Sequence, residues 1–311
     1  MLGFFFAVFS AASLGLTAVT IRRGVLGSTP AIGTLITVVL GVPLFVVAAL
    51  VTGQLLRAAE VTLPGYLALG ATGMLQMVIG RYCFYRSIQA IGANQAELFQ
   101  SIQIPVSIGI AMVLLGESFG LVAALAVAMI MAGPVLILLP KRPGASPAPA
   151  APGKGASGAV DAAARPAIRM GEGLLFGALA IVAFSAGDVL ARGVLADTGL
   201  GLLGGLTAYV SAAVVLLVLV VVTGRVQEVL TAPKVAARWF LLATVMGFLA
   251  QMSRYVALAL APVAVVVPLM RTVPVFVLLF SFLINRRLEV FGPRVVTGII
   301  LAVAGMVLMA L

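Results

Sequence analysis

Long runs of hydrophobic residues, interrupted by short polar or glycine- and proline-containing breaks, dominate the chain. Residues 2–21 carry no charge, and a helix that rises about 1.5 Å per residue needs about 20 such residues to cross a bilayer. Counting runs bounded by charge, proline or glycine predicts ten membrane-spanning helices. They lie near residues 3–21, 30–52, 64–89, 94–115, 119–139, 172–195, 200–222, 238–260, 262–285 and 292–311.

Two breaks between predicted helices are very short, and one break, between the first five helices and the last five, is long. The breaks at 91–93 (Ile-Gly-Ala) and 261–262 (Ala-Pro) predict tight helical hairpins, because glycine and proline interrupt helices. The long break, residues 140–170, is rich in proline, glycine, alanine and serine. Such a composition cannot bury enough apolar surface to offset chain entropy. We therefore predict a flexible linker between a five-helix unit at 1–139 and another at 171–311.

The two five-helix units share a pattern of residues. The tetrapeptide RGVL begins at Arg23 and again at Arg192, 169 positions later, and the same offset pairs Pro105 with Pro274 and Ala90 with Ala259. With a slip of three residues, the FG dipeptides at 119–120 and 291–292 also align, as do the glycines at 133 and 305. Their common order indicates an internal duplication. Because five is odd, the second unit enters the membrane from the opposite side, as in transporters with inverted repeats.

The composition narrows the range of functions. Hydrophobic residues make up 63% of the 311 positions and charged residues 9%, whereas soluble domains carry about 25% charged residues. The chain has no histidine and one cysteine, Cys83, so we expect no intramolecular disulfide and no imidazole-based metal site or triad. Met1 is followed by no basic region, so we expect the first apolar segment to be retained and not cleaved as a signal peptide.

The positive charges bear on partners and on topology. The net charge is +10, but the basic residues stand at the ends of apolar runs, which argues against a nucleic-acid partner. With ten spans, fourteen Lys and Arg residues fall on one side of the membrane, against Arg57 and Arg192 on the other. Because basic residues are retained in cytoplasmic loops, the count favours termini that lie together outside the cytoplasm.

The segment AIGANQAELFQSIQIPVSIGIAMVLLGES, residues 90–118, resembles the fourth helix of EamA-type members of the drug/metabolite transporter superfamily. A small-residue turn, a helix-breaking Pro105 and a closing Leu-Gly-Glu at 115–117 follow in that family's order. The second copy keeps the turn and Pro274 but has Asn285-Arg286-Arg287 at the closing motif. The resemblance implies two EamA-like five-helix repeats, a central cavity and export of small metabolites. Relatives are generally drawn with both termini cytoplasmic, opposite to the charge count.

The predicted fold is therefore an all-α membrane protein with ten transmembrane helices, arranged as two inverted five-helix repeats around a central cavity. An ionised group deep in a bilayer costs a few kcal/mol, about 2.5–3.5 on insertion scales, and must face a partner, water or solute. Arg271 lies about ten residues into the ninth span, between Pro268 and Pro274. We predict that it recognises a carboxylate, since guanidinium offers two parallel donors. A structural pair with Glu97 or Asp188 is the alternative.

Three further helices carry polar stripes at helical spacing. Glu97, Gln100, Gln103 and Ser107 follow one another on the fourth span and predict a polar cavity wall. Glu97 is either a carboxylate of the first helical turn, favoured by the helix dipole, or, when desolvated, a candidate proton carrier. The other stripes are Gly73, Gln76 and Gly80 on the third span and Gly247, Gln251 and Arg254 on the eighth.

The glycines of these stripes allow close helix packing, and the glutamines and Arg254 are candidate substrate contacts. Arg254 and Arg81 lie nearer the span ends, where long stems can carry their charge to the headgroups. Asp188 and Arg192 have the spacing of an intrahelical ion pair, and Asp188 is the second candidate for proton coupling. Tyr82, Tyr85 and Trp239 either stack on an aromatic solute or lie at the bilayer interface.

We therefore expect a secondary transporter in the cell membrane that exports a small metabolite, such as an amino acid or other carboxylate-bearing compound, by alternating access. The expected partners are the small-molecule substrate and membrane lipid. No cofactor is expected, since the chain lacks the P-loop pattern GxxxxGK[ST]. Two alternatives are a membrane-embedded enzyme acting on a lipid, for which the acidic residues are too scattered, and a lipid flippase. A scaffold or receptor would require a larger soluble surface.

Overall fold

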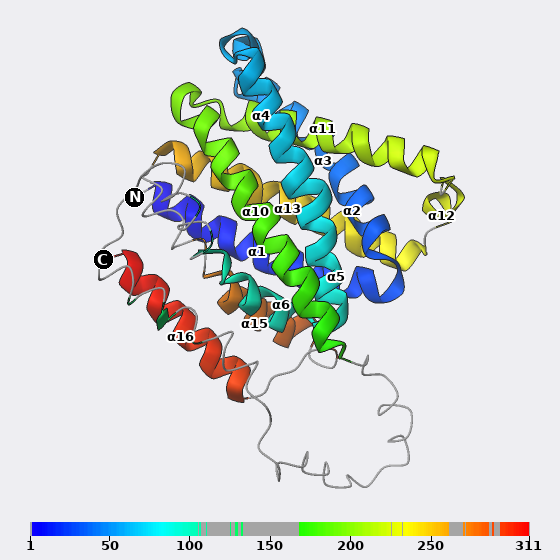
Figure 1. Ribbon diagram of the computed structural model, residues 1–311, viewed down its shortest axis with the longest axis vertical. Coiled ribbons are helices and arrows are strands. Elements are labelled where there is room, and N and C mark those ends of the chain that lie inside the picture. The colour runs from blue at the N-terminus through cyan, green and yellow to red at the C-terminus, as the bar shows by residue number, and fades with distance from the viewer. Residues whose placement is uncertain are drawn as a thin grey trace, which may run out of the picture.

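Within the part of the chain that the computed structural model describes, every regular element is a helix (Figure 1). The described residues are 2–104, 106, 110, 125, 128, 129, 132, 168–224, 226–231, 233–260, 270, 272–285, 288 and 293–310. Six helical stretches among them are long and apolar enough to cross a membrane: Phe5–Gly27, Pro30–Val51, Leu63–Ile91, Met170–Leu195, Gly201–Val222 and Lys234–Arg254. Two shorter apolar helices follow at Val273–Ile284 and Val296–Gly305.

The helices of the first half follow the predicted spans closely. They are α1 (Leu2–Gly27), α2 (Pro30–Val39), α3 (Gly41–Val51), the 3₁₀-helix η1 (Gln54–Glu60), α4 (Leu63–Gly73), the π-helix η2 (Met74–Gly80), α5 (Arg81–Ile91) and α6 (Ala93–Gln100). Two predicted single helices are thus interrupted. The second breaks at Leu40 into α2 and α3, and the third contains the π-helix between α4 and α5.

The helices that the structure describes in the second half are α10 (Met170–Thr198), α11 (Gly201–Val222), α12 (Val226–Leu230), α13 (Lys234–Leu260), α15 (Val273–Ile284) and α16 (Pro293–Ala310). The predicted fifth span lies almost wholly outside the described residues, as do most of the predicted linker and the break at 261–262. The count of ten spans therefore stays a prediction.

The turns between helices use the expected local chemistry. Thr29 and Thr62 each accept a hydrogen bond from a backbone N–H three residues later, and a proline lies in the first turn of each helix that follows, a common start for a helix. The predicted hairpin at 91–93 is confirmed. Gly92 joins α5 to α6 with φ = 90°, a backbone conformation that residues with a Cβ rarely adopt.

The two halves of the molecule interlock. Helix α1 packs along α13 and α15, while α10 packs against α4, η2, α5 and α6. The first helix of each half therefore lies against the third and fourth helical segments of the other half. Helix α11 packs against α4, α3 and α2. Helix α10 runs beside α4 and α5 at the front of Figure 1.

Two consecutive arginines near the end of α1 fix the ends of helices from both halves. Arg22 is buried, and its Nη1 donates to the carbonyl oxygens of Ile88 (2.6 Å) and Gln89 (2.8 Å) at the end of α5. Arg23 donates through Nε to Asn285 Oδ1 (2.7 Å) and through Nη2 to the last carbonyl of α15. The carbonyls at a helix end lack intrahelical partners, so each arginine satisfies one such end.

The start of α10 joins the same end of the bundle. The Arg169 N–H donates to the carbonyl oxygen of Ala90 (3.0 Å), and Glu172 accepts from Arg86 (2.5 Å) and Arg169 (2.8 Å). We call this region, formed by Arg22, Arg23, Arg86 and Arg169, the basic end. Since α1 finishes at the basic end and α10 begins there, the first helices of the two halves run in opposite directions. In Figure 1, α1 begins and α16 finishes on the same side.

Candidate functional site

The carboxylate of Asp188, in the middle of α10, is the centre of a polar cluster inside the bundle. Its Oδ1 accepts from Gln76 Nε2 (2.7 Å) and from Arg254 Nη2, and its Oδ2 accepts from Gln103 Nε2 (3.0 Å). We call these four residues the Asp188 cluster. Gln76 and Gln103 belong to the first half of the chain, and Asp188 and Arg254 to the second. The cluster thus connects the two halves.

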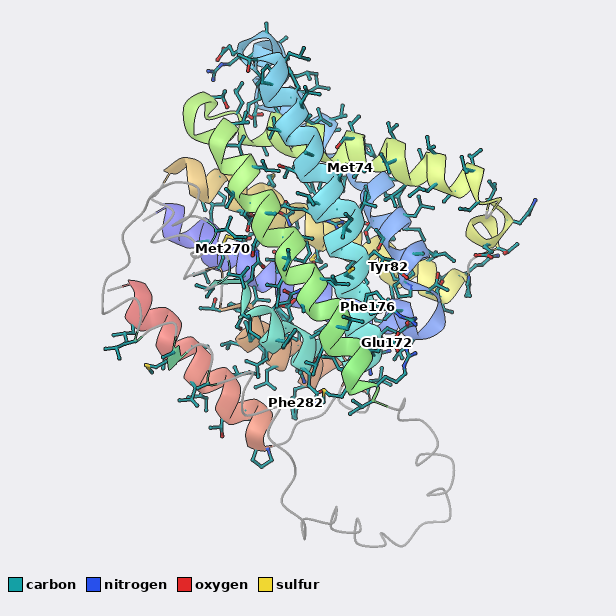
Figure 2. The ribbon with its side chains drawn as sticks, viewed as in Figure 1. Met74, Tyr82, Glu172, Phe176, Met270 and Phe282 are labelled. Carbon is teal, nitrogen blue, oxygen red and sulfur yellow. The ribbon has the colours of Figure 1, made fainter. Side chains whose placement is uncertain are left out.

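Gln76 reaches Asp188 because of two local features. It lies in the π-helix Met74–Gly80, whose start is marked by Met74 in Figure 2, and such segments recur at functional sites. Opposite it on α10 stands Gly187, where an added Cβ would lie 2.4 Å from Gln76 Cγ. The glycine therefore leaves the space that the glutamine side chain occupies.

Gln103 approaches the cluster from a break in the fourth predicted span. After Gln100 the backbone changes from α-helical to 3₁₀-type hydrogen bonds, with Ser101 and Ile102 N–H donating three residues back, and Ile104 N–H donating to the Ser101 carbonyl. Pro105 follows directly in the sequence and has no N–H to continue an α-helical ladder. Because a 3₁₀ turn contains about three residues, side chains three apart point in the same direction. Gln100 and Gln103 therefore lie on one side of the chain.

The charges of the cluster are balanced. The side chains of Asp188 and Arg254 are each 23% exposed, and an unpaired charge at such a position is destabilising. Among the described side chains, the carboxylate has one cationic partner and two neutral amide donors. Such charge-assisted bonds are about twice as strong as neutral ones. The arrangement holds one negative and one positive group together between helices α10 and α13.

A second buried polar group lies on α5 and α11. Arg81 Nη2 donates to Tyr209 Oη (2.7 Å) and contacts Met77 Sδ (2.9 Å), and its guanidinium carbon lies 5.2 Å from the centre of the Tyr209 ring. Tyr209 is fully buried, with its ring against Gly41. Nearby, Tyr85 Oη donates to Thr37 Oγ1 (3.3 Å). Arg81 and Arg254 thus have partners within the bundle, and the predicted reach of their side chains to the headgroups stays a prediction.

Within the described part of the chain, two glutamines next to the Asp188 cluster have buried polar atoms without a protein hydrogen bond. Gln100 is 4% exposed, and both its Nε2 and its Oε1 lack a partner. On α13, Gln251 Oε1 is also buried and unpaired. Buried polar atoms in folded proteins are nearly always hydrogen-bonded. These three atoms are therefore candidates for contact with a ligand.

The structure does not gather all the predicted site residues. Tyr82 is 37% exposed on the outside of the bundle and meets Phe176 of α10 edge to face, with ring centres 6.3 Å apart (Figure 2). Arg271, its predicted neighbour Pro268 and the side chain of Arg192 lie outside the described residues. The predicted Asp188–Arg192 pair therefore stays a prediction, beside the observed partners of Asp188.

The position predicted for Glu97 is wrong. Helix α6 begins at Ala93 and has no acidic residue in its first turn, so Glu97 is half-buried in the second turn. The favourable effect of a helix N-terminus on a carboxylate falls off within the first turn. The helix dipole therefore explains the presence of a carboxylate at position 97 less well than the nearness of this position to Gln100.

The glycine stripes fulfil the packing prediction in part. A Cβ at Gly73 would lie 2.1 Å from the Ala208 carbonyl oxygen of α11, and one at Gly80 would lie 2.8 Å from the Phe184 ring of α10. Both glycines thus permit close packing, but against different helices. At Gly247 the nearest atom would be 3.7 Å away, in Thr17, so that position is not tightly packed.

Tyr209, the partner of Arg81, was not among the predicted site residues. Tyr209 lies in an apolar run with no charged residue near it. A tyrosine in the middle of such a run needs a hydrogen-bond partner when buried, and this is the signal that could have found it. Trp239, predicted either to stack on an aromatic solute or to lie at the bilayer interface, lies under the guanidinium of Arg23 at 4.9 Å, at the basic end.

Comparisons with known proteins bear on the whole chain. The model of the EamA-like transporter family matches residues 1–139 and 171–311. A solved structure described only as "Crystal structure of protein" aligns with a TM-score of 0.57 and 14% identity, over 98% of this chain and 94% of that chain. At that identity the likeness shows the fold alone. A comparison with curated proteins finds no match.

Proposed function

Because the chain belongs to the EamA-like transporter family, and is thus a membrane transporter, we propose that it is a secondary transporter that exports a small metabolite by alternating access. The favoured cargo is an amino acid or another carboxylate-bearing compound. The two halves would enclose the solute in a central cavity and rock to expose it to each side in turn. The protein would lie in the cell membrane with both termini on one side.

The observation that carries the proposal is the Asp188 cluster. A carboxylate and a guanidinium are expensive within a membrane and mark solute or ion pathways. Here they are held by Gln76 and Gln103 from the other half of the chain. A relative movement of the halves would have to break or exchange these two bonds. The cluster is thus placed to respond to transport.

We assign the solute contacts to Gln76, Gln100, Gln103, Gln251 and Arg254, with Arg271 as the group that binds a solute carboxylate. Arg254 is bound to Asp188, so in this conformation its charge is already balanced. The Arg271 guanidinium would then supply the positive charge for an anionic group. Tyr82 lies on the outer surface of the bundle and is therefore a weaker candidate for solute contact than the buried glutamines.

Asp188 is the better of the two candidates for proton coupling, ahead of Glu97. Protonation of its carboxylate would neutralise the partner of Arg254 and weaken the bonds from both glutamines, because hydrogen bonds to charged groups are the stronger ones. One proton would therefore loosen contacts between the halves. This gives a physical route by which a pH gradient could drive solute movement.

A solute screen in proteoliposomes, with and without an imposed pH gradient, tests the proposal. We expect one class of carboxylate-bearing metabolite to accumulate only with the gradient. Arg271→Ala should abolish this transport without loss of folded protein. Asp188→Asn should remove the response to the gradient while solute exchange persists. If none of the carboxylate-bearing solutes crosses the membrane, the proposed cargo is refuted. If transport by Asp188→Asn still responds to the pH gradient, Asp188 is not the proton carrier.

A further inference from the structure

The unpaired amides of Gln100 and Gln251 carry information about the solute. Gln100 offers one NH₂ group and one carbonyl oxygen, and Gln251 offers a second carbonyl oxygen, all buried and without a protein partner. The unmet set is therefore two acceptors and one donor group. All three atoms are neutral, so the site they form carries no charge of its own.

The two glutamines lie at the same depth in the bundle. Helix α6 starts at the basic end, next to the end of α5 that Arg22 holds. Helix α13 starts there too, because Trp239 lies under Arg23 and Phe240 fits against Gly24. Both helices therefore run away from the basic end.

Gln100 precedes Gln103 by three residues, and Gln251 precedes Arg254 by three. Gln103 and Arg254 meet on the two oxygens of one carboxylate, Asp188. Since three residues correspond to about 4.5 Å along an α-helix and about 6 Å along a 3₁₀-helix, the Cα atoms of both glutamines lie about one turn from the residues that bind Asp188, on the side of the basic end.

We propose that Gln100 and Gln251 together bind a primary carboxamide group of the transported solute. A primary carboxamide has two N–H donors and one carbonyl acceptor. The two N–H groups would donate to Gln100 Oε1 and Gln251 Oε1, and the carbonyl would accept from Gln100 Nε2. This inference rests on the proposed transport of a small metabolite and specifies its class as an amide-bearing one.

Groups of similar shape satisfy this set less well. A carboxylate has only acceptors and would face two carbonyl oxygens, and an ammonium has no acceptor for Gln100 Nε2. A methyl or methylene group would leave all three atoms unpaired. Sites built to hydrogen-bond a ligand group reject analogues that lack it by up to about 10⁴-fold, because the buried polar atoms of the site are then left without partners.

Equilibrium binding to the full chain in lipid nanodiscs tests the inference independently of transport. The probes are L-glutamine and L-asparagine, which carry the carboxamide, L-glutamate and L-aspartate, which carry a carboxylate in its place, and L-norleucine, which carries an ethyl group in place of the carboxamide of glutamine. We expect L-glutamine or L-asparagine to bind at least about tenfold more tightly than its carboxylate counterpart and than L-norleucine. Gln100→Leu and Gln251→Leu should each reduce this preference at least about tenfold.

A second readout separates a binding role from a structural one. Because Gln100→Leu replaces two unpaired buried polar atoms by an apolar group of similar size, it should raise the apparent melting temperature of the protein without solute, by about 2–4 °C. A glutamine that held the fold together would lower it. Gln227→Leu makes the same change at an exposed position of α12 and should alter neither binding nor melting.

Each possible result either supports or overturns the inference. A carboxamide preference that Gln100→Leu removes, together with the higher melting temperature, supports the inference. Binding of none of the amides, equal binding of glutamine and norleucine, or a lower melting temperature of Gln100→Leu overturns it. If amides bind but no amino acid crosses proteoliposome membranes, the inference stands and the proposed transport function fails. If carboxylates without an amide are transported, the reverse holds.

Discussion

The ion pair of the Asp188 cluster allows a quantitative test of how much the cluster stabilises the bundle. Asp188→Asn would leave the Arg254 guanidinium without its carboxylate and would weaken the bonds from Gln76 and Gln103, which then end on a neutral group. Removing one member of a buried ion pair costs about 3–5 kcal/mol. Since 23% of each side chain is exposed, water screens part of this, and we expect about 3 kcal/mol of lost stability.

The double change should be milder than either single one. With Asp188→Asn and Arg254→Gln together, neither charge is left without its partner. The double variant should therefore lose only about 1 kcal/mol in free energy of unfolding relative to the parent. The coupling energy between the two positions is then at least about 2 kcal/mol, well above the about 0.5 kcal/mol seen for independent sites. A loss of about 3 kcal/mol corresponds to a fall of roughly 6–12 °C in melting temperature.

The single cysteine provides the assay. Cys83 is buried, so a dye that fluoresces on reaction with thiols reports unfolding during a temperature ramp of the purified protein, without any added label site. The four proteins of the cycle are the parent, the two single variants Asp188→Asn and Arg254→Gln, and the double variant.

The exposed pair of Arg57 and Glu60, which lies in η1 with bonds of 2.7 Å, is the matched control, and its cycle should show no measurable coupling. If the losses at positions 188 and 254 simply add, the reasoning about a shared buried charge pair is refuted.

Two further predictions concern the packing and the ends of the helices. Gly73→Ala should lower the melting temperature by roughly 4 °C or more, because the new Cβ would collide with the Ala208 carbonyl at 2.1 Å, whereas Gly70→Ala in the same helix, with 3.9 Å of clearance, should be neutral; equal effects would contradict the packing. Arg22→Ala should destabilise the protein by about 1–3 kcal/mol through the lost carbonyl bonds at the end of α5. The exposed Arg57→Ala should leave the thermal melt unchanged, and similar losses in both would count against the role of Arg22.

Several features of the fold and the site could be read from individual segments. The apolar runs predicted the helices, and Gly92 predicted the hairpin between α5 and α6, because a span or a glycine turn is a property of a short stretch of chain. The rarity of polar groups in membranes marked Gln76, Gln103, Asp188 and Arg254 as candidate site residues. The boundary of α6 was less well defined, and Glu97 was therefore placed one turn too early.

The partners of these polar residues could not be read in the same way. The spacing of Asp188 and Arg192 suggested an ion pair along one helix, which stays a prediction. No local pattern pointed to Arg254, which lies 66 residues from Asp188 and binds its carboxylate. Arg81 similarly binds Tyr209, 128 residues away. Hydrophobic periodicity specifies which face of a helix is apolar, but it contains no information about which helix covers that face.

The sequence by itself therefore determined the membrane environment, the two related halves and the identity of the buried polar residues, because each follows from local composition and spacing. Only the tertiary structure decided that Gln76, Gln103 and Arg254 meet on Asp188, and that amide atoms of Gln100 and Gln251 are buried without a hydrogen bond in the described part of the chain. Helices in a bundle contact one another through small residues such as Gly187, through breaks such as the π-helix, and at crossing angles set by many side chains together. The hydrogen bonds between them depend on this packing.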